Sequence, residues 1–221
     1  MELKKKTSWN DITVGDFQYI YNLEKEDPED KLLKLIALVN GVDYEDILDM
    51  PISKLEEHFE DIDFLSREPQ SKLVKGTYEL NGRVYKVYMK ELTTAQYIDF
   101  KQLADKYYEH LAQFLTVFII PARHRYGDGY DLDIARQDIE TMSITDARAV
   151  ASFFLTRYAI STRIFLRFSI AQLRKEMRRT KDPKEKRILK EGIEEAKKTI
   201  KALRHTTPTG RRGQAPTTGS H

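Results

Sequence analysis

The last third of the chain contains one stretch that constrains the fold more than any other. Residues 144–181 contain neither glycine nor proline, and Asp182-Pro183 follows directly. Beyond this dipeptide, apolar residues recur at steps of 4, 3, 4 and 3, at Leu189, Ile193, Ala196, Ile200 and Leu203. A proline at the first helical position and this spacing predict a second helix that packs back along the first. We therefore predict an antiparallel helical hairpin over residues 144–205 and a fold that is mainly α.

The N-terminal 65 or so residues show four short helical patterns with clear start and stop signals. The signals are Thr13 with Asp16, Asp27 with Pro28, Asn40 with Gly41, and Ser53 with Glu56. The first and last pairs have the spacing of a capping box, and Asn-Gly is a common helix stop. Residues 1–70 are accordingly predicted to form a small helical bundle whose apolar stripes pack a local core.

Two runs rich in β-branched and aromatic residues meet at Asn81-Gly82, a strong signal for a two-residue hairpin turn. This turn places Tyr78 opposite Tyr85 and Leu80 opposite Arg83. One face of the hairpin is then apolar, with Val74, Tyr78, Leu80, Tyr85, Val87 and Met89. A lone hairpin is marginally stable, so we expect this face to pack on helices or the strands to join another chain's sheet.

Residues 93–121 are predicted to be helical, with a second capping box at Thr93 and Gln96 and a stop at Pro121. Because residues 111–120 are apolar on all sides, we expect them to form the central buried helix. A loop over residues 122–133 and a short helix follow. The predicted segments are thus the bundle (1–70), a hairpin with central helices (71–143), the long helical hairpin (144–205) and a flexible basic tail (206–221).

Signals for catalysis are weak throughout the chain. Asp128, Asp131 and Asp133 lie near two glycines, but the spacing does not match an EF-hand loop and the closing glutamate is missing. The histidines lack the spacing of a zinc site, there is no cysteine, and no GxSxG, Walker lysine or GxGxxG pattern occurs. We expect a protein that is not an enzyme and has no catalytic residues, cofactor or metal site.

Charge is distributed unevenly along the chain. Residues 174–221 contain 15 Lys/Arg and 6 Asp/Glu, against a net charge of +2 for the whole sequence. Phosphate contacts are conceivable at Arg174, Lys175, Arg178, Arg179, Lys181, Arg211 and Arg212. Glutamates alternate with lysines along the last predicted helix, however, and no RNA-binding aromatic motif accompanies them. Sequence-independent nucleic-acid binding is therefore the weaker alternative, and no segment is apolar enough to predict a membrane partner.

Several short phrases and their order resemble a known family. They are "WNDITVGDFQ" (9–18), "KLLKLIALVNGVDYEDI" (31–47), the "LNG" turn, "ELTTAQYIDF" (91–100) and "IIPARHRYGDGYD" (119–131). Over about residues 9–154 the chain resembles tail assembly chaperones of tailed bacteriophages that infect gut Bacteroidetes. The resemblance implies a non-enzymatic helical protein that binds the tape-measure protein and recruits tail tube subunits in the host cytoplasm.

The chain departs from shorter members of that family in its C-terminal helical hairpin and basic tail. This departure favours, as the alternative, a permanent virion component of the neck, tail or capsid interior, next to neck or portal-proximal proteins. Under either reading we expect a homo-oligomer within an assembly. The last predicted helix offers only a narrow Leu/Ile seam, which cannot cover every large side chain of the long helix before it, so Phe165 and Phe168 need another partner surface. The candidate interface residues are therefore Phe165 and Phe168 with their neighbours Arg163 and Arg167, and the amphipathic Tyr88, Tyr107, Tyr108, Tyr126 and Tyr130.

Overall fold

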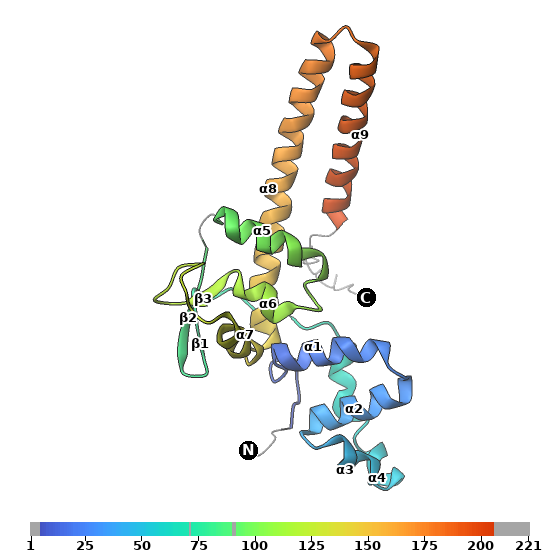
Figure 1. Ribbon diagram of the computed structural model, residues 1–221. Helices are drawn as coiled ribbons and strands as arrows, with labels where there is room; N and C mark the ends of the chain where they lie inside the picture. Colours follow the sequence, from blue (N-terminus) through green and yellow to red (C-terminus); the bar gives the residue numbers. More distant parts are fainter. Residues whose placement is uncertain (1–4, 71, 90–91, 206–221) are drawn as a thin grey trace, which may run out of the picture. The chain divides into compact units, whose positions relative to one another are not determined.

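The computed structural model describes residues 5–70, 72–89 and 92–205, and the fold is mainly α with one small antiparallel sheet (Figure 1). Packing divides the chain into two compact units, Met1–Ala151 (unit 1) and Ser152–His221 (unit 2). The predicted tail, residues 206–221, lies outside the described part of the chain.

Unit 1 begins with short helices whose predicted starts are mostly confirmed. They are α1 (Val14–Asn22), η1 (Leu23–Lys25), α2 (Pro28–Asn40), α3 (Tyr44–Leu48), α4 (Ile52–Glu56) and the 3-10 helix η2 (Glu60–Ser66). Thr13 and Asp16 form the predicted capping box, Asp27 caps α2, and Gly41 ends α2 with φ of 64°. The capping box predicted at Ser53 is wrong: Pro51 occupies the N-cap of α4 without a side-chain cap. The φ of Pro51, −58°, sets the helical start there, which places Ser53 inside the first turn.

These helices share a small core of their own. Ile36 and Ala37 on α2 pack against Ile47 on α3, and all three are almost fully buried. Partly buried side chains extend this cluster: Leu32, Leu33, Met50, Leu55 and Ile62. All of these residues lie within positions 32–62, so the apolar periodicity of neighbouring helices was enough to predict this core.

The sheet contains three strands in the order β1 (Thr77–Leu80), β2 (Arg83–Val87) and β3 (Ile119–Pro121). Tyr78 pairs with Tyr85 and Leu80 with Arg83, as the turn predicted. Asn81 and Gly82 both have positive φ, 47° and 72°, the backbone that a type I′ turn requires.

The third strand corrects the prediction of one helix over residues 93–121. That segment forms α5 (Thr94–Leu103), the 3-10 helix η3 (Ala104–Lys106) and α6 (Leu111–Thr116), and it ends in β3. Ile120 pairs with Lys86, so the hairpin is joined by a strand of its own chain. An apolar run that is buried on every side suits a buried strand as well as a helix, and here the free edge of β2 decides between them.

The main core of unit 1 lies between the sheet, α5, α6, α7 (Leu132–Glu140) and the first residues of the long helix α8 (Ile144–Arg179). Its centre is an aromatic cluster in which the ring centroids of Phe100, Phe114 and Phe118 are 5.2–5.7 Å apart. Two backbone hydrogen bonds tie the starts of α1 and α8 together. Val14 N donates to Met142 O at 2.8 Å, and Ile144 N donates to Ile12 O at 2.9 Å.

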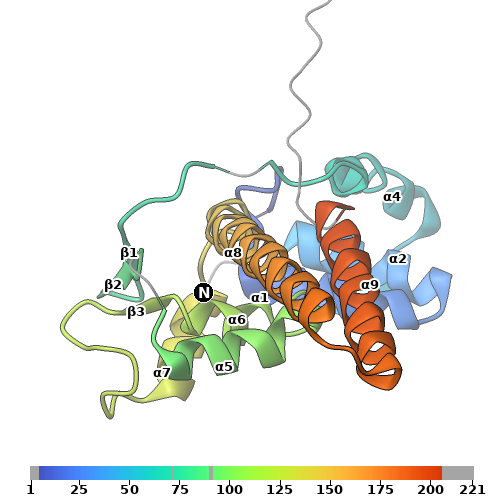
Figure 2. The same ribbon diagram turned by 90° about the horizontal axis from the view of Figure 1, so that it is seen from above.

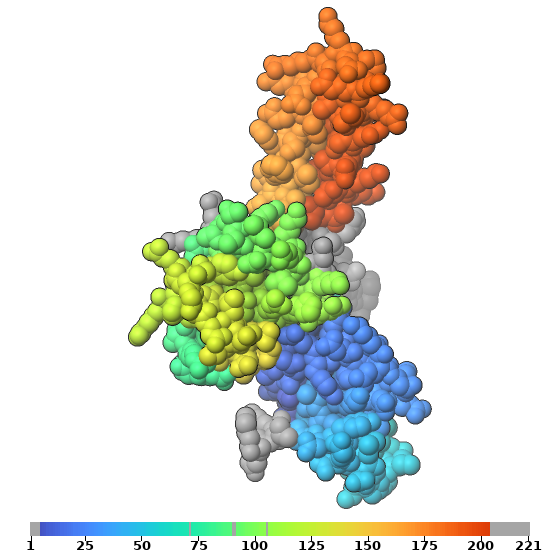
Figure 3. Space-filling view, in the orientation of Figure 1, coloured from blue at the N-terminus to red at the C-terminus, as the bar shows by residue number. Residues whose placement is uncertain are grey.

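The predicted C-terminal helical hairpin is confirmed. Helix α8 (Ile144–Arg179) is followed by α9 (Pro183–His205), and the two run antiparallel in unit 2 (Figures 1 and 2). Ile170 on α8 and Ile193 and Ala196 on α9 form the buried seam, flanked by Leu166, Leu173, Met177 and Ile200. The space-filling view shows α8 and α9 in contact along this seam (Figure 3).

Candidate interaction surface

The three aspartates of the 122–133 loop serve local structure. Asp131 accepts hydrogen bonds from the backbone N–H groups of Asp133 (2.9 Å) and Ile134 (3.1 Å) and so caps α7. Asp133 forms an ion pair with Arg136 at 3.3 Å, and Asp128 accepts from the backbone of Arg125 at 2.6 Å. Across the described ranges, no group of three or more His, Cys, Asp or Glu side chains is arranged to hold a metal ion.

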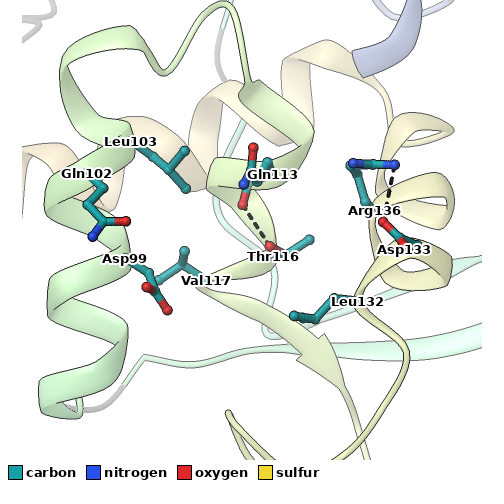
Figure 4. Close-up of a pocket in the computed structure, with 9 residues that line it drawn as sticks. All are labelled: Asp99, Gln102, Leu103, Gln113, Thr116, Val117, Leu132, Asp133 and Arg136. Atoms are coloured by element: carbon teal, nitrogen blue, oxygen red, sulfur yellow. Dashed lines mark hydrogen bonds and ion pairs between the residues drawn. The ribbon is translucent and has the colours of Figure 1, made fainter.

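A pocket of about 380 Å³ lies between α5, α6 and α7 (Figure 4). Its lining residues are Asp99, Gln102, Leu103, Gln113, Thr116, Val117, Leu132, Asp133 and Arg136. Several of their polar groups make local contacts: Arg136 pairs with Asp133 at 3.3 Å, Asp99 accepts a hydrogen bond from Tyr126, and the Thr116 hydroxyl donates to the Gln113 backbone carbonyl at 2.7 Å. The one hydroxyl among these lining residues, that of Thr116, thus donates to a backbone carbonyl rather than to a side chain that could act as a base.

A buried carboxylate joins α7 to the β1–β2 hairpin. Asp138 is 2% exposed and accepts hydrogen bonds from Tyr85 Oη (2.5 Å), Arg83 Nη1 (2.8 Å) and Asn81 Nδ2 (3.0 Å). Burial by itself would raise the pKa of Asp138, but these three donors together outweigh burial and hold the pKa below its ordinary value of 3.8. The network locks the turn onto α7. Sequence reasoning missed it, although the pairing of Arg83 with Leu80 already placed a cation on the apolar face of the hairpin.

The five candidate tyrosines are partly buried and make contacts inside unit 1. The rings of Tyr107 and Tyr108 lie 4.0 Å apart, and Tyr107 also packs on Phe114 at 5.5 Å. Burial raises the pKa of Tyr107. These two side chains therefore belong to an aromatic cluster at the edge of the main core, and their contact with a partner stays a prediction.

The other three tyrosines surround the 122–133 loop or the end of the sheet. Tyr126 donates to Asp99, and burial, reinforced by this hydrogen bond, raises its pKa. Tyr130 packs beside His124 at 5.6 Å between ring centroids, and Tyr88 continues the sheet by donating its backbone N–H to Phe118 O at 2.7 Å. Their role as interface anchors is likewise still a prediction.

Five of the seven candidate phosphate contacts lie near the turn between α8 and α9. Those that the structure describes are exposed: Arg174, Lys175, Arg178, Arg179 and Lys181. Arg211 and Arg212 lie outside the described residues. On α9 the charges pair along the helix, with Arg187 to Glu191 at 3.0 Å and Lys197 to Glu194 at 2.6 Å, an ordinary solvated face.

Helix α8 carries a row of large apolar side chains that face solvent. They are Ile160 (44% exposed), Ile164 (63%), Phe165 (65%) and Phe168 (61%), and we call them the α8 stripe. Successive residues of a helix are 100° apart, so Phe168 and Ile164 point away from the seam residues that follow them two positions later, Ile170 and Leu166. The structure thus places the predicted Phe165 and Phe168 together, on the side of α8 opposite α9.

Every charged residue of α8 near the α8 stripe is a cation. No Asp or Glu occurs between Asp146 and Glu176, whereas arginines and one lysine recur at Arg148, Arg157, Arg163, Arg167, Arg174 and Lys175. The predicted Arg163 is partly exposed and donates from Nε to Ala159 O at 3.2 Å. Arg167 and Arg174 are exposed and form no ion pair with any other described residue. An apolar row with a basic margin is a surface suited to an acidic partner.

Comparison of the chain with protein-family models, with curated proteins and with solved structures gave no match. Within the described ranges, no helix combines the length and the apolar character needed to cross a membrane.

Proposed function

We propose that this chain is a non-enzymatic assembly protein that acts through protein–protein contacts in the morphogenesis of a bacteriophage tail or neck. The observation that carries the proposal is the α8 stripe. Four large side chains, each more than two fifths exposed, line one face of a helix whose opposite face is already packed. Contiguous apolar surface of this kind marks an interaction site, because leaving it in water is unfavourable.

Two further observations support this proposal. The buried carboxylate of Asp138 is held by Tyr85 and Arg83, and in the pocket Arg136 pairs with Asp133, so these charged groups serve structural contacts. The phage context comes from the sequence resemblance over residues 9–154, which implies tape-measure and tail tube proteins as partners in the host cytoplasm.

A permanent virion component is the second candidate, and a specific observation favours it. The α8 stripe belongs to the helical hairpin, the part of the chain by which it departs from shorter chaperones. Because the stripe lies outside residues 9–154, the region of the resemblance, it suits a lasting contact with neck or tail proteins. Quantitative mass spectrometry of purified virions separates the two candidates. Peptides of this chain in a fixed ratio to other virion proteins indicate a component, and their absence indicates a chaperone.

The proposal is tested by a double substitution in the α8 stripe, Ile164→Glu with Phe168→Glu. Tagged wild-type chain purified from infected cells should carry tape-measure, tail tube or neck proteins, and the double variant should lose them. Ile188→Glu is the matched control, because Ile188 is 67% exposed on α9 and lies outside the stripe. If the variant and the control retain the same phage proteins, the stripe is not the assembly surface.

A further inference from the structure

We propose that the α8 stripe of one copy binds an acidic patch on the N-terminal helices of a second copy, so that the chain self-associates head to tail. This inference rests on the proposed function and names the partner of the same surface. The acidic patch consists of the exposed apolar residues Leu48, Ile52 and Phe59 together with the exposed carboxylates of residues 43–63.

The apolar part of the acidic patch is exposed while its neighbours build the local core. Ile52 is 74% exposed, Leu48 55% and Phe59 39%. By contrast, Met50, Leu55 and Ile62 pack against the cluster of Ile36, Ala37 and Ile47. The α3–α4–η2 segment therefore has one face committed to the core of unit 1 and apolar side chains left over on its outer face.

The charge of this segment is the opposite of that around the α8 stripe. Residues 43–63 contain nine Asp/Glu and a single Lys. Asp61 is engaged by Lys5 at 2.7 Å and by His58 at 3.0 Å. Glu56 and Glu60 are exposed, follow Ile52 at helical spacing, and form no ion pair with the other described residues. Apolar side chains flanked by free carboxylates complement apolar side chains flanked by free arginines.

The same charges disfavour the competing occupants within this chain. Pairing two α8 stripes face to face would place Arg167 and Arg174 of one copy against cations of the other, and α8 offers no carboxylate between Asp146 and Glu176 to compensate. Residues 206–221 are also a poor match, because they contain Arg211 and Arg212 and no acidic residue. The acidic patch of a second copy is the partner that both the apolar and the charged groups favour.

A contact between two different surfaces of the same chain is heterologous. Each bound copy leaves its other surface free for the next copy, so the contact propagates until a ring closes or a filament forms. Self-association should therefore proceed beyond a dimer as concentration rises.

The test is sedimentation velocity of the full chain over a concentration series at low and high salt. The wild type should associate in a concentration-dependent way and should dissociate on going from about 50 to about 500 mM salt, because the marginal charges are solvent-exposed. Arg167→Glu with Arg174→Glu should weaken association about tenfold or more, and Glu56→Arg with Glu60→Arg should do the same. Circular dichroism establishes that each variant keeps its helical content.

Mixing the two charge-reversed variants gives the sharpest readout. Each has one unaltered surface, so an equimolar mixture should recover association that neither variant shows alone, and one chain carrying all four substitutions should also recover it. The matched controls reverse exposed charges elsewhere: Lys186→Glu with Lys201→Glu on α9, and Glu24→Arg with Glu79→Arg in unit 1. Both should associate like the wild type.

Three results would overturn the inference. One is a wild type that stays monomeric up to about 200 µM, where even a weak contact would be populated. Another is an association constant of the Glu56→Arg with Glu60→Arg variant that equals the wild-type value, which would mean that the α8 stripe binds a different partner. The third is duplex DNA displacing self-association with a steep salt dependence, which would assign the stripe to phosphate binding. Retained phage proteins in the variants that lose self-association would leave the proposed function standing without this contact.

Discussion

At the scale of single residues, the clearest determinant of the fold is the Asn81-Gly82 turn. Both residues adopt positive φ, and a β-branched side chain at Gly82 would be strained whatever the surrounding space. We expect Gly82→Val to lower the free energy of unfolding by about 1 kcal/mol or more. Thermal or urea unfolding measures this change. Gly76→Val is the control, because Gly76 has no positive φ and an added Cβ there meets no atom; equal effects at both positions would contradict a conformational cause.

Asp138 supplies a second residue-level prediction, with a pH dependence. Its folded pKa lies below 3.8, so the stabilisation from its ionised form is present above the unfolded pKa, near 3.9, and is lost as pH falls through the folded pKa. We expect Asp138→Asn to lower the free energy of unfolding at pH 7 by about 2 kcal/mol or more, because three donors lose a charged acceptor. The difference from the wild type should shrink as pH falls from about 6 to about 3.

Urea unfolding at several pH values checks this prediction. Asp133→Asn is the matched control, since Asp133 is an exposed carboxylate on the same helix, and its substitution should change stability little at any of these pH values. A gap between wild type and Asp138→Asn that stays constant down to pH 3 would show that the ionised carboxylate is not what stabilises the network.

At the scale of elements, most local signals could be read from the sequence, the Ser53 capping box excepted, whereas the pairing of β3 with β2 could not. The Thr13 and Thr93 capping boxes, the Asn81-Gly82 turn and the Leu/Ile spacing of α9 each act over a few residues, and the structure contains all of them. Strand β3 depends on β2, more than 30 residues earlier, and its apolar run has no alternation to reveal a strand. Contacts at such separations have no periodic signature in one sequence.

The same distinction applies to the candidate surface. Phe165 and Phe168 were found because one narrow seam on α9 cannot cover every large side chain of α8, which is a matter of counting helix faces. The acidic patch escaped notice because Leu48, Ile52 and Phe59 read as core residues until α4 was placed. Helix α4 starts after Pro51 and turns Leu55 toward the Ile36 cluster, so the side chain of Ile52 faces solvent.

The α8–α9 seam gives a prediction for this element. Ile193 is 4% exposed at the centre of the seam, so Ile193→Asp would bury an unpaired charge. We expect it to destabilise the helical hairpin by about 2–4 kcal/mol and to remove hydrogen-exchange protection from the amides of α9. Ile188→Asp is the control, since Ile188 is 67% exposed on the same helix. Unchanged protection in Ile193→Asp would mean that α9 is stable without the seam.

At the scale of the whole molecule, the two units have separate cores. The Phe100, Phe114 and Phe118 cluster and the Ile36 cluster lie within unit 1, whereas the seam of α8 and α9 lies within unit 2. A unit whose buried contacts are internal can fold without the other. The two surfaces of the proposed contact are divided in the same way, the acidic patch in unit 1 and the α8 stripe in unit 2.

This division predicts the result of deleting residues 174–221. The truncated chain should keep the folded core of unit 1, detected as a cooperative thermal transition and as retained exchange protection in α2, α6 and α7. Removing α9 uncovers Leu166 and Ile170 on the side of α8 opposite the stripe, so that helix would then be apolar on two faces. We therefore expect the truncated chain to aggregate at concentrations where the full chain does not, and to lose co-assembly with phage tail or neck proteins. Adding Leu166→Glu and Ile170→Glu to the truncation should restore solubility. If the truncated chain still co-purifies with those proteins at normal stoichiometry, α9 and the end of α8 are not needed for co-assembly, and the α8 stripe that the truncation keeps is sufficient on the side of unit 2.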